Sequence, residues 1–108
     1  MIDRELLNLA AKAAGYKVHG SGKLFWIWKD SIVDWVDWSP LSDDGDALRL
    51  AVTLGIELVF TRNKIGAGRH SPASCLTWAN EDRKVEDPYA ATRRAIVRSA
   101  AEIGRNMK

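Results

Sequence analysis

The sequence predicts an α+β fold: a single, mainly antiparallel sheet of four to five strands with three helices, in the order α-β-β-(β)-α-β-β-α. Three segments show helical spacing of apolar residues between helix start and stop signals. The other apolar segments are short and follow one another through brief turns in two runs, which favours antiparallel pairing over an α/β fold. The 108 residues are expected to form one domain, residues 1–108.

The first third of the chain predicts a helix and two or three strands. The helix is expected to start at Asp3 and to stop at Gly15, where the apolar period ends. An extended segment at 16–19 and a glycine turn lead to a strand at 24–29, which has apolar side chains on both faces. This pattern predicts either a central strand covered on both sides or a strand with an exposed, aromatic-rich face. The next strand, 32–38, has no cleanly apolar face, so its pattern does not fix its register.

The stretch from Trp38 to Leu58 contains the clearest helix signals. Proline after Ser39 excludes a helix there, and Asp43 is expected to be the N-cap, with Asp46 three residues on completing an approximate capping box. Gly55 is expected to end the helix, and a strand is expected to follow at 56–61. The apolar residues that follow the helical period are Leu48, Ala51 and Val52, with Leu50 and Leu54 on a flanking line.

The last third predicts a hairpin and a helix. A loop at 63–72 is expected to connect the strand at 56–61 to a return strand at 74–79. Asp87 and Pro88 have the pattern of an N-cap followed by proline in the first helical turn. The inward side of this helix is predicted to consist of Tyr89, Thr92, Ile96, Ser99 or Ala100, and Ile103.

Composition narrows the class of protein. The single Cys75 excludes an internal disulfide and fits a reducing cytosol. We see no charged and then apolar leader and no long apolar run, so we expect neither a signal peptide nor a membrane span, and a cytoplasmic location. Charge is uneven along the chain: residues 30–61 carry seven acidic and one basic residue, whereas residues 62–108 carry ten basic and five acidic residues.

No set of residues has the spacing of a known catalytic or metal site, and we predict no catalytic residue, no metal and no cofactor. Asp43, Asp44 and Asp46 could supply oxygen ligands to a divalent cation, but helix capping explains the same residues, and we favour capping. A Cys75 dyad with His19 or His70 would need a proximity that the sequence does not show. The glycines next to Lys64 match neither a P-loop nor a dinucleotide fingerprint.

Two groups of residues are candidates for binding. Four tryptophans lie within thirteen residues, and we expect two of the four in the core and at least one of Trp26, Trp28 and Trp35 exposed. The predicted partner-binding residues are Trp26, Trp28, Trp35, Lys64, Arg69 and His70. The alternative is nucleic-acid or nucleotide binding, with phosphate contacts from Arg93, Arg94 and Arg98 on the last helix and from the basic hairpin.

Two sequence blocks carry a resemblance to a protein family. They are WSPLSDDGDALRLAV, from Trp38 to Val52, and DPYAATRRAIVRSAAEIG, from Asp87 to Gly104. Together with the opening helix they resemble a widespread family of small proteins encoded by tailed phages and prophages, from which the tryptophan-rich segment and the glycine-rich hairpin depart. The resemblance implies a phage gene expressed in the bacterial cytosol, and it transfers no catalytic residue.

The residues and the resemblance together predict a non-enzymatic phage accessory protein. We expect it to bind a host protein by protein–protein contact and to act as an inhibitor of a defence system. The tryptophan segment and the hairpin would form the partner surface. The chain is expected to be a monomer or a homodimer, with no membrane partner.

Overall fold

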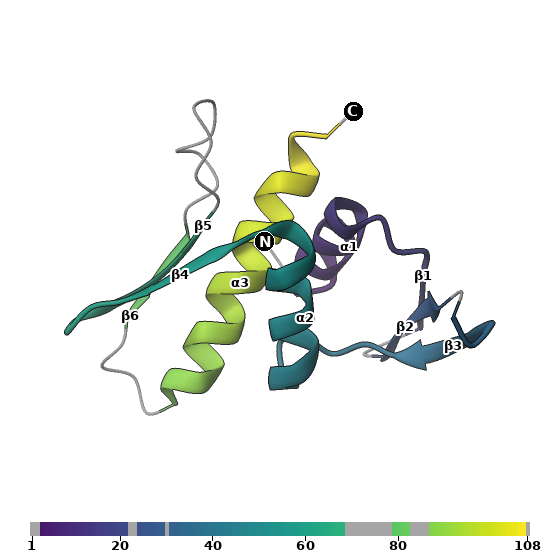
Figure 1. Cartoon of the computed structure of the whole chain (residues 1–108), viewed down its shortest axis with the longest axis horizontal. Coiled ribbons are helices and arrows are strands. Elements are labelled where there is room, and N and C mark those ends of the chain that lie inside the picture. Colours follow the sequence, from purple (N-terminus) through teal and green to yellow (C-terminus); the bar gives the residue numbers. More distant parts are fainter. Residues whose placement is uncertain (1–2, 22–23, 30, 69–78, 83–86, 108) are drawn as a thin grey trace.

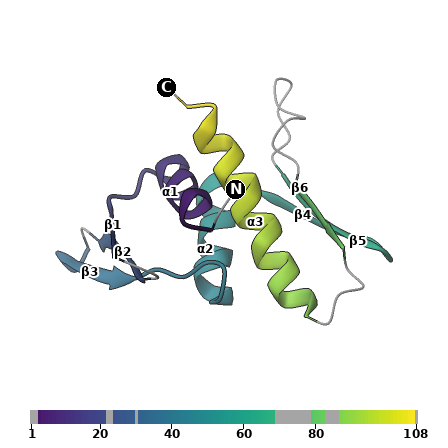
Figure 2. The same cartoon turned by 180° about the vertical axis from the view of Figure 1, so that it is seen from behind.

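The computed structural model describes residues 3–21, 24–29, 31–68, 79–82 and 87–107. Three helices occupy the middle of the molecule, and a small antiparallel sheet lies on either side of them (Figures 1 and 2). The elements are α1 (Asp3–Ala14), β1 (Val18–Ser21), β2 (Leu24–Lys29), β3 (Asp34–Asp37), α2 (Asp44–Leu54), β4 (Glu57–Phe60), β5 (Lys64–Gly68), β6 (Ala79–Asp82) and α3 (Pro88–Arg105).

The α+β class and the three helices are confirmed, but the single sheet is not. The strands form two separate sheets: the N-terminal sheet, in the order β1-β2-β3, and the C-terminal sheet, in the order β4-β5-β6. One reason lies at β3, where the backbone N–H of Trp35 donates to its neighbour Asp34 Oδ1 at 2.8 Å instead of to a further strand. Exposed carboxylates at Asp34 and Asp37 also make this edge unfavourable for pairing with another strand.

Helix α3 is the central element of the fold, because it packs against α1, α2, β5 and β6. Alanines on several of its sides let these neighbours approach closely, so its buried surface is wider than one helical stripe. Ile96, Ser99, Ala100 and Ile103 are buried as predicted, whereas Tyr89 is 69% exposed. The buried residues that the pattern did not predict are Ala91, Ala95, Val97, Ala101 and Gly104. No helix among the described residues is both long and apolar enough to cross a membrane.

Helix α2 begins and ends where the sequence predicts. Asp43 is the N-cap, and its Oδ2 accepts a hydrogen bond from the N–H of Asp46 at 2.8 Å. In a full capping box the Asp46 side chain would accept from the backbone N–H of the N-cap residue. Here Asp46 Oδ2 instead accepts from the N–H of Ser39 at 2.9 Å, and this hydrogen bond stabilises the turn that precedes the helix. Gly55 ends the helix with φ +66°, a conformation that favours glycine.

The inward face of α2 differs from the prediction. Leu48 and Val52, expected on the apolar line, are exposed. The core side instead consists of Ala47, Leu50, Ala51 and Leu54. The core cluster joins these residues to apolar side chains of α1, α3, β2 and β5.

The turn between β2 and β3 contains a strained residue. Val33 has φ +50°, in the left-handed region that β-branched side chains disfavour, and its side chain is exposed. We therefore expect Val33→Gly to raise the free energy of unfolding by about 0.5–1 kcal/mol, since relief of strain exceeds the entropy cost of glycine. Urea denaturation measures the change. Ile32→Gly is the control: it removes a neighbouring exposed side chain without relieving that strain, so it should not stabilise the protein.

Candidate interaction surface

The pleat of the N-terminal sheet divides its side chains between two faces. Phe25 and Ile27 of β2 are buried on the face that packs against the core. Trp26 and Trp28 alternate with them and therefore lie on the opposite face. The strand register places His19 directly opposite Trp26, and Trp35 directly opposite Trp28. We call this set, His19, Trp26, Trp28 and Trp35, the aromatic face.

The rings of the aromatic face contact one another across the strands. His19 stacks on Trp26 with ring centroids 5.6 Å apart and an interplanar angle of 28°. Trp28 and Trp35 meet edge to face at 5.6 Å, and His19 lies 6.1 Å from Trp35. His19, Trp26 and Trp35 line an open hollow of about 410 Å³. Contacts of this kind fix the orientation of each ring before a partner arrives.

The tryptophan prediction is confirmed in one respect and wrong in another. Trp35 is 42% exposed, so at least one of the three candidate tryptophans is on the surface as expected. Of the four tryptophans at 26–38, only Trp38 is buried, at 3% exposure, against an expectation of two in the core. It packs edge-on against Tyr16 with centroids 5.8 Å apart. Trp26 and Trp28 are half-buried, because neighbouring rings and strands cover part of each indole.

The three arginines of α3 that are predicted to contact phosphate each pair with a carboxylate of this chain. Arg93 Nη1 lies 2.6 Å from Asp44, and its Nε donates to the carbonyl oxygen of Leu41 at 2.9 Å. Two further arginines pair with other elements: Arg94 with Asp3 of α1 at 3.5 Å, and Arg98 with Glu81 of β6 at 3.0 Å. Each guanidinium therefore faces a carboxylate of this chain, which weakens the electrostatic basis for phosphate binding.

The remaining predicted partner-binding residues are only partly described. Lys64 is exposed at the start of β5, on the opposite side of the helices from the aromatic face (Figure 1). Arg69 and His70 lie outside the described residues, as does Cys75. The structure thus brings Trp26, Trp28 and Trp35 together and places Lys64 away from them.

The acidic residues at the start of α2 are used in capping and ion pairing. Asp43 caps the helix, Asp46 binds Ser39 and Arg49, and Asp44 binds Arg93. These contacts support the capping interpretation that the sequence favours. Within the part of the chain that the structure describes, no group of three or more His, Cys, Asp or Glu side chains is arranged to hold a metal ion.

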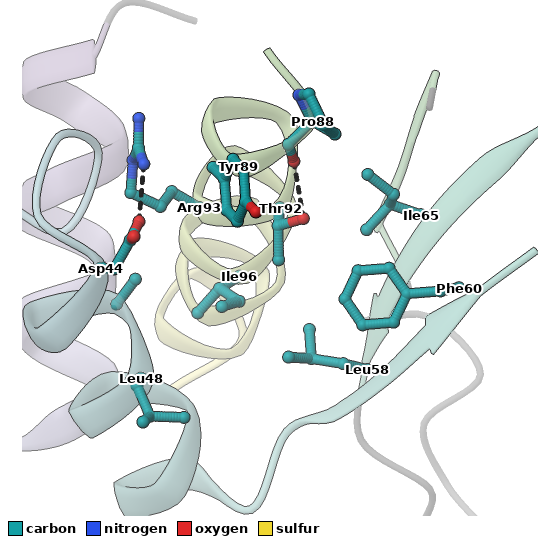
Figure 3. A pocket seen from close by; sticks show the side chains of 11 residues that line it. Asp44, Leu48, Leu58, Phe60, Ile65, Pro88, Tyr89, Thr92, Arg93 and Ile96 are labelled. Atoms are coloured by element: carbon teal, nitrogen blue, oxygen red, sulfur yellow. Dashed lines mark hydrogen bonds and ion pairs between the residues drawn. The ribbon is translucent and has the colours of Figure 1, made fainter. Parts of the chain in front are cut away.

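The structure also contains an apolar groove that the sequence pattern did not indicate. It lies between α2, α3 and the strands β4 and β5, and has a volume of about 390 Å³ (Figure 3). The ion pair of Asp44 and Arg93 lies at one side of it, and Tyr89 reaches over it from α3 (Figure 3). Its apolar lining residues are Ala47, Leu48, Leu58, Phe60, Ile65, Pro88 and Ile96. The exposure of Leu48, unusual for a leucine on an amphipathic helix, is explained by its position at the rim of this groove.

Comparisons of the chain with protein-family models, curated proteins and solved structures give no match.

Proposed function

We propose that this protein is a non-enzymatic binding protein that holds a protein partner on its aromatic face. The observation that carries the proposal is the position of Trp26, Trp28 and Trp35 on the face of the N-terminal sheet that points away from the helices. Tryptophan is the residue type most enriched among interface hot spots, because an ordered indole buries a large apolar area at low entropic cost. The core does not need these side chains, since Phe25 and Ile27 fill it from the same strand.

The partner that we propose is a host protein, and the action is inhibition by occupying a surface of a defence component. The phage resemblance of the two sequence blocks supports a host partner and a place of action in the bacterial cytosol. The carboxylates at the start of α2 have structural partners, which leaves the aromatic face as the more prominent candidate for function. A protein that inhibits its partner by covering a surface needs to bind that partner but does not need to catalyse a reaction.

The proposal is tested by affinity capture from bacterial lysates with Trp35→Ala. We expect the wild-type protein to retain a partner in stoichiometric amount and the variant to lose it, because the most exposed indole of the aromatic face is gone. Its stability should fall by about 1–3 kcal/mol, because the ring pair with Trp28 and the buried part of the indole are lost together. Circular dichroism and thermal unfolding check that the variant is folded.

Tyr89→Ser is the matched control, since it removes an aromatic ring that is even more exposed but lies on α3, away from the aromatic face. Capture should be unchanged in this variant. Equal capture by the wild-type protein and Trp35→Ala would contradict the proposal. So would the absence of any stoichiometric partner in lysates of several hosts.

A further inference from the structure

We infer that the partner places a cationic side chain, an arginine or a lysine of a basic segment, in the hollow formed by His19, Trp26 and Trp35. The inference rests on the proposed function, because it names the chemistry of what the aromatic face binds. Three observations lead to it: the shape of the hollow, the charge beside it, and the contrast with the other acidic residues.

The rings that line the hollow come from two neighbouring cross-strand pairs, His19 with Trp26 and Trp28 with Trp35. The rings of His19 and Trp26 are nearly parallel, at 28°, and the ring of Trp35 is inclined by 60° to that of His19. The rings therefore border the space in two different orientations. Aromatic faces carry a partial negative charge, and tryptophan attracts cations most strongly of the aromatic residues. An open hollow with this lining suits the planar guanidinium or the ammonium of a side chain that projects from a protein surface.

One carboxylate of β3, that of Asp37, lies on the aromatic face. Asp37 lies directly opposite Trp26 in the strand ladder and, two residues from Trp35, shares its face of the sheet. Asp34 lies on the opposite face of the sheet, directly across from Lys29, and its Oδ1 accepts a hydrogen bond from the backbone N–H of Trp35. Neither carboxylate forms an ion pair with any residue that the structure describes. Lys17 lies on the other side of β2, across from Trp28, so it is separated by a strand from Asp37.

The acidic residues at the start of α2, in contrast to Asp37, form ion pairs within the chain. Asp43 and Asp46 are paired with Arg49, and Asp44 is paired with Arg93. Asp37 is thus the acidic group on the aromatic face that forms no ion pair with a described residue, and its carboxylate is open to an external cation. This negative charge disfavours a phosphate, and so it favours a basic protein segment over a nucleic-acid strand stacked on the indoles.

The test uses short peptides that differ in one group. One contains arginine, and the other contains citrulline, which has nearly the same shape and no charge. Binding is followed through the indole N–H resonances of Trp26 and Trp35 and through tryptophan fluorescence. We expect the arginine peptide to shift both resonances and to bind about tenfold more tightly than the citrulline peptide. Raising the salt concentration should weaken only the arginine peptide.

Single substitutions measure how much the carboxylate and the indole each contribute to the affinity for the arginine peptide. Asp37→Asn removes one charge and keeps the shape, so it should weaken the arginine peptide several-fold and leave the citrulline peptide unchanged. Trp35→Leu should weaken the arginine peptide about tenfold, and Tyr89→Ser should have no effect. Equal binding of the two peptides would overturn the inference. So would tighter binding of an oligothymidylate than of the arginine peptide at these indoles.

The two proposals fail in different ways. If the lysate partner is lost with Trp35→Ala but is retained by Asp37→Asn and is not displaced by the arginine peptide, then the aromatic face binds a partner and the cation inference is wrong. If the arginine peptide binds with the expected charge dependence but Trp35→Ala captures the partner as well as the wild-type protein does, then the chemistry of the hollow is right and the proposed function is wrong.

Discussion

Gly104→Ala is expected to lower the free energy of unfolding by about 3 kcal/mol, the largest effect that we expect of any single methyl group in this protein. A Cβ atom at Gly104 would overlap the carbonyl oxygen of Leu9 and would lie 2.8 Å from its carbonyl carbon. Because the atoms it meets belong to the backbone of α1, no side-chain rotation relieves the clash, and the whole helix has to move. The gain in helix propensity from glycine to alanine, about 1 kcal/mol, offsets only part of this cost.

The effect should be large because the contact between α1 and α3 is the most extensive between any two elements of the fold. Small residues bring the two helices together, among them Ala10 and Ala11 on α1 and Ala100 and Ala101 on α3, all buried. Moving α1 outward would loosen this whole interface. Close packing at this density leaves no room for a methyl group.

Gly45→Ala is the control for Gly104→Ala, since both glycines lie within helices. A Cβ at Gly45 would lie 3.2 Å from the guanidinium of Arg49 and from the carboxylate of Asp43, which are the ends of flexible side chains. We expect this change to shift stability by less than about 1 kcal/mol in either direction. Urea denaturation of the two variants measures the difference, and equal values would refute the close approach of α1 and α3.

The sequence could predict the limits of the helices but not the contact at Gly104. It was wrong about the loop expected at 63–72, because residues 64–68 of that segment form strand β5. Asp43, Gly55 and Asp87 are local signals, and the hydrogen bonds and dihedral angles that they predict involve residues within one turn. Close approach of two helices depends on which elements meet, and Leu9 and Gly104 are far apart in the chain. For the same reason the pattern placed Tyr89 inward, although the core is already filled by alanines on other sides of α3.

The candidate surface was predicted in its residue types and not in its arrangement. The apolar character of both faces of the strand at 24–29 predicted either a doubly covered strand or an exposed aromatic face, and the structure shows the second. The pattern of β3 has no clean apolar face, so the pairing of Trp35 with Trp28 could not be derived from it. The hollow depends on that register, and so does the position of Asp37 opposite Trp26.

Replacement of Arg93 is the second change for which we expect a large effect on stability. Arg93 is a surface-type residue in the sequence pattern, yet its side chain is only 15% exposed. Its guanidinium links α3 to the segment that begins α2, through Asp44 at 2.6 Å and the carbonyl oxygen of Leu41 at 2.9 Å. We expect Arg93→Ala to lower the free energy of unfolding by about 2 kcal/mol, because a charged hydrogen bond to a half-buried carbonyl is lost together with the pair.

Arg94→Ala is the comparison for Arg93→Ala, because Arg94 is a neighbouring arginine with an exposed ion pair to Asp3. Its removal should cost less than about 0.5 kcal/mol. Thermal and urea unfolding measure both variants, and an oligonucleotide titration at low salt measures phosphate binding. If Arg93 serves the fold, Arg93→Ala is the less stable variant and neither variant changes oligonucleotide affinity. If α3 is instead a phosphate-binding helix, both variants weaken oligonucleotide binding and their stabilities differ little, since the carboxylates beside these arginines would then be competitors and not structural partners.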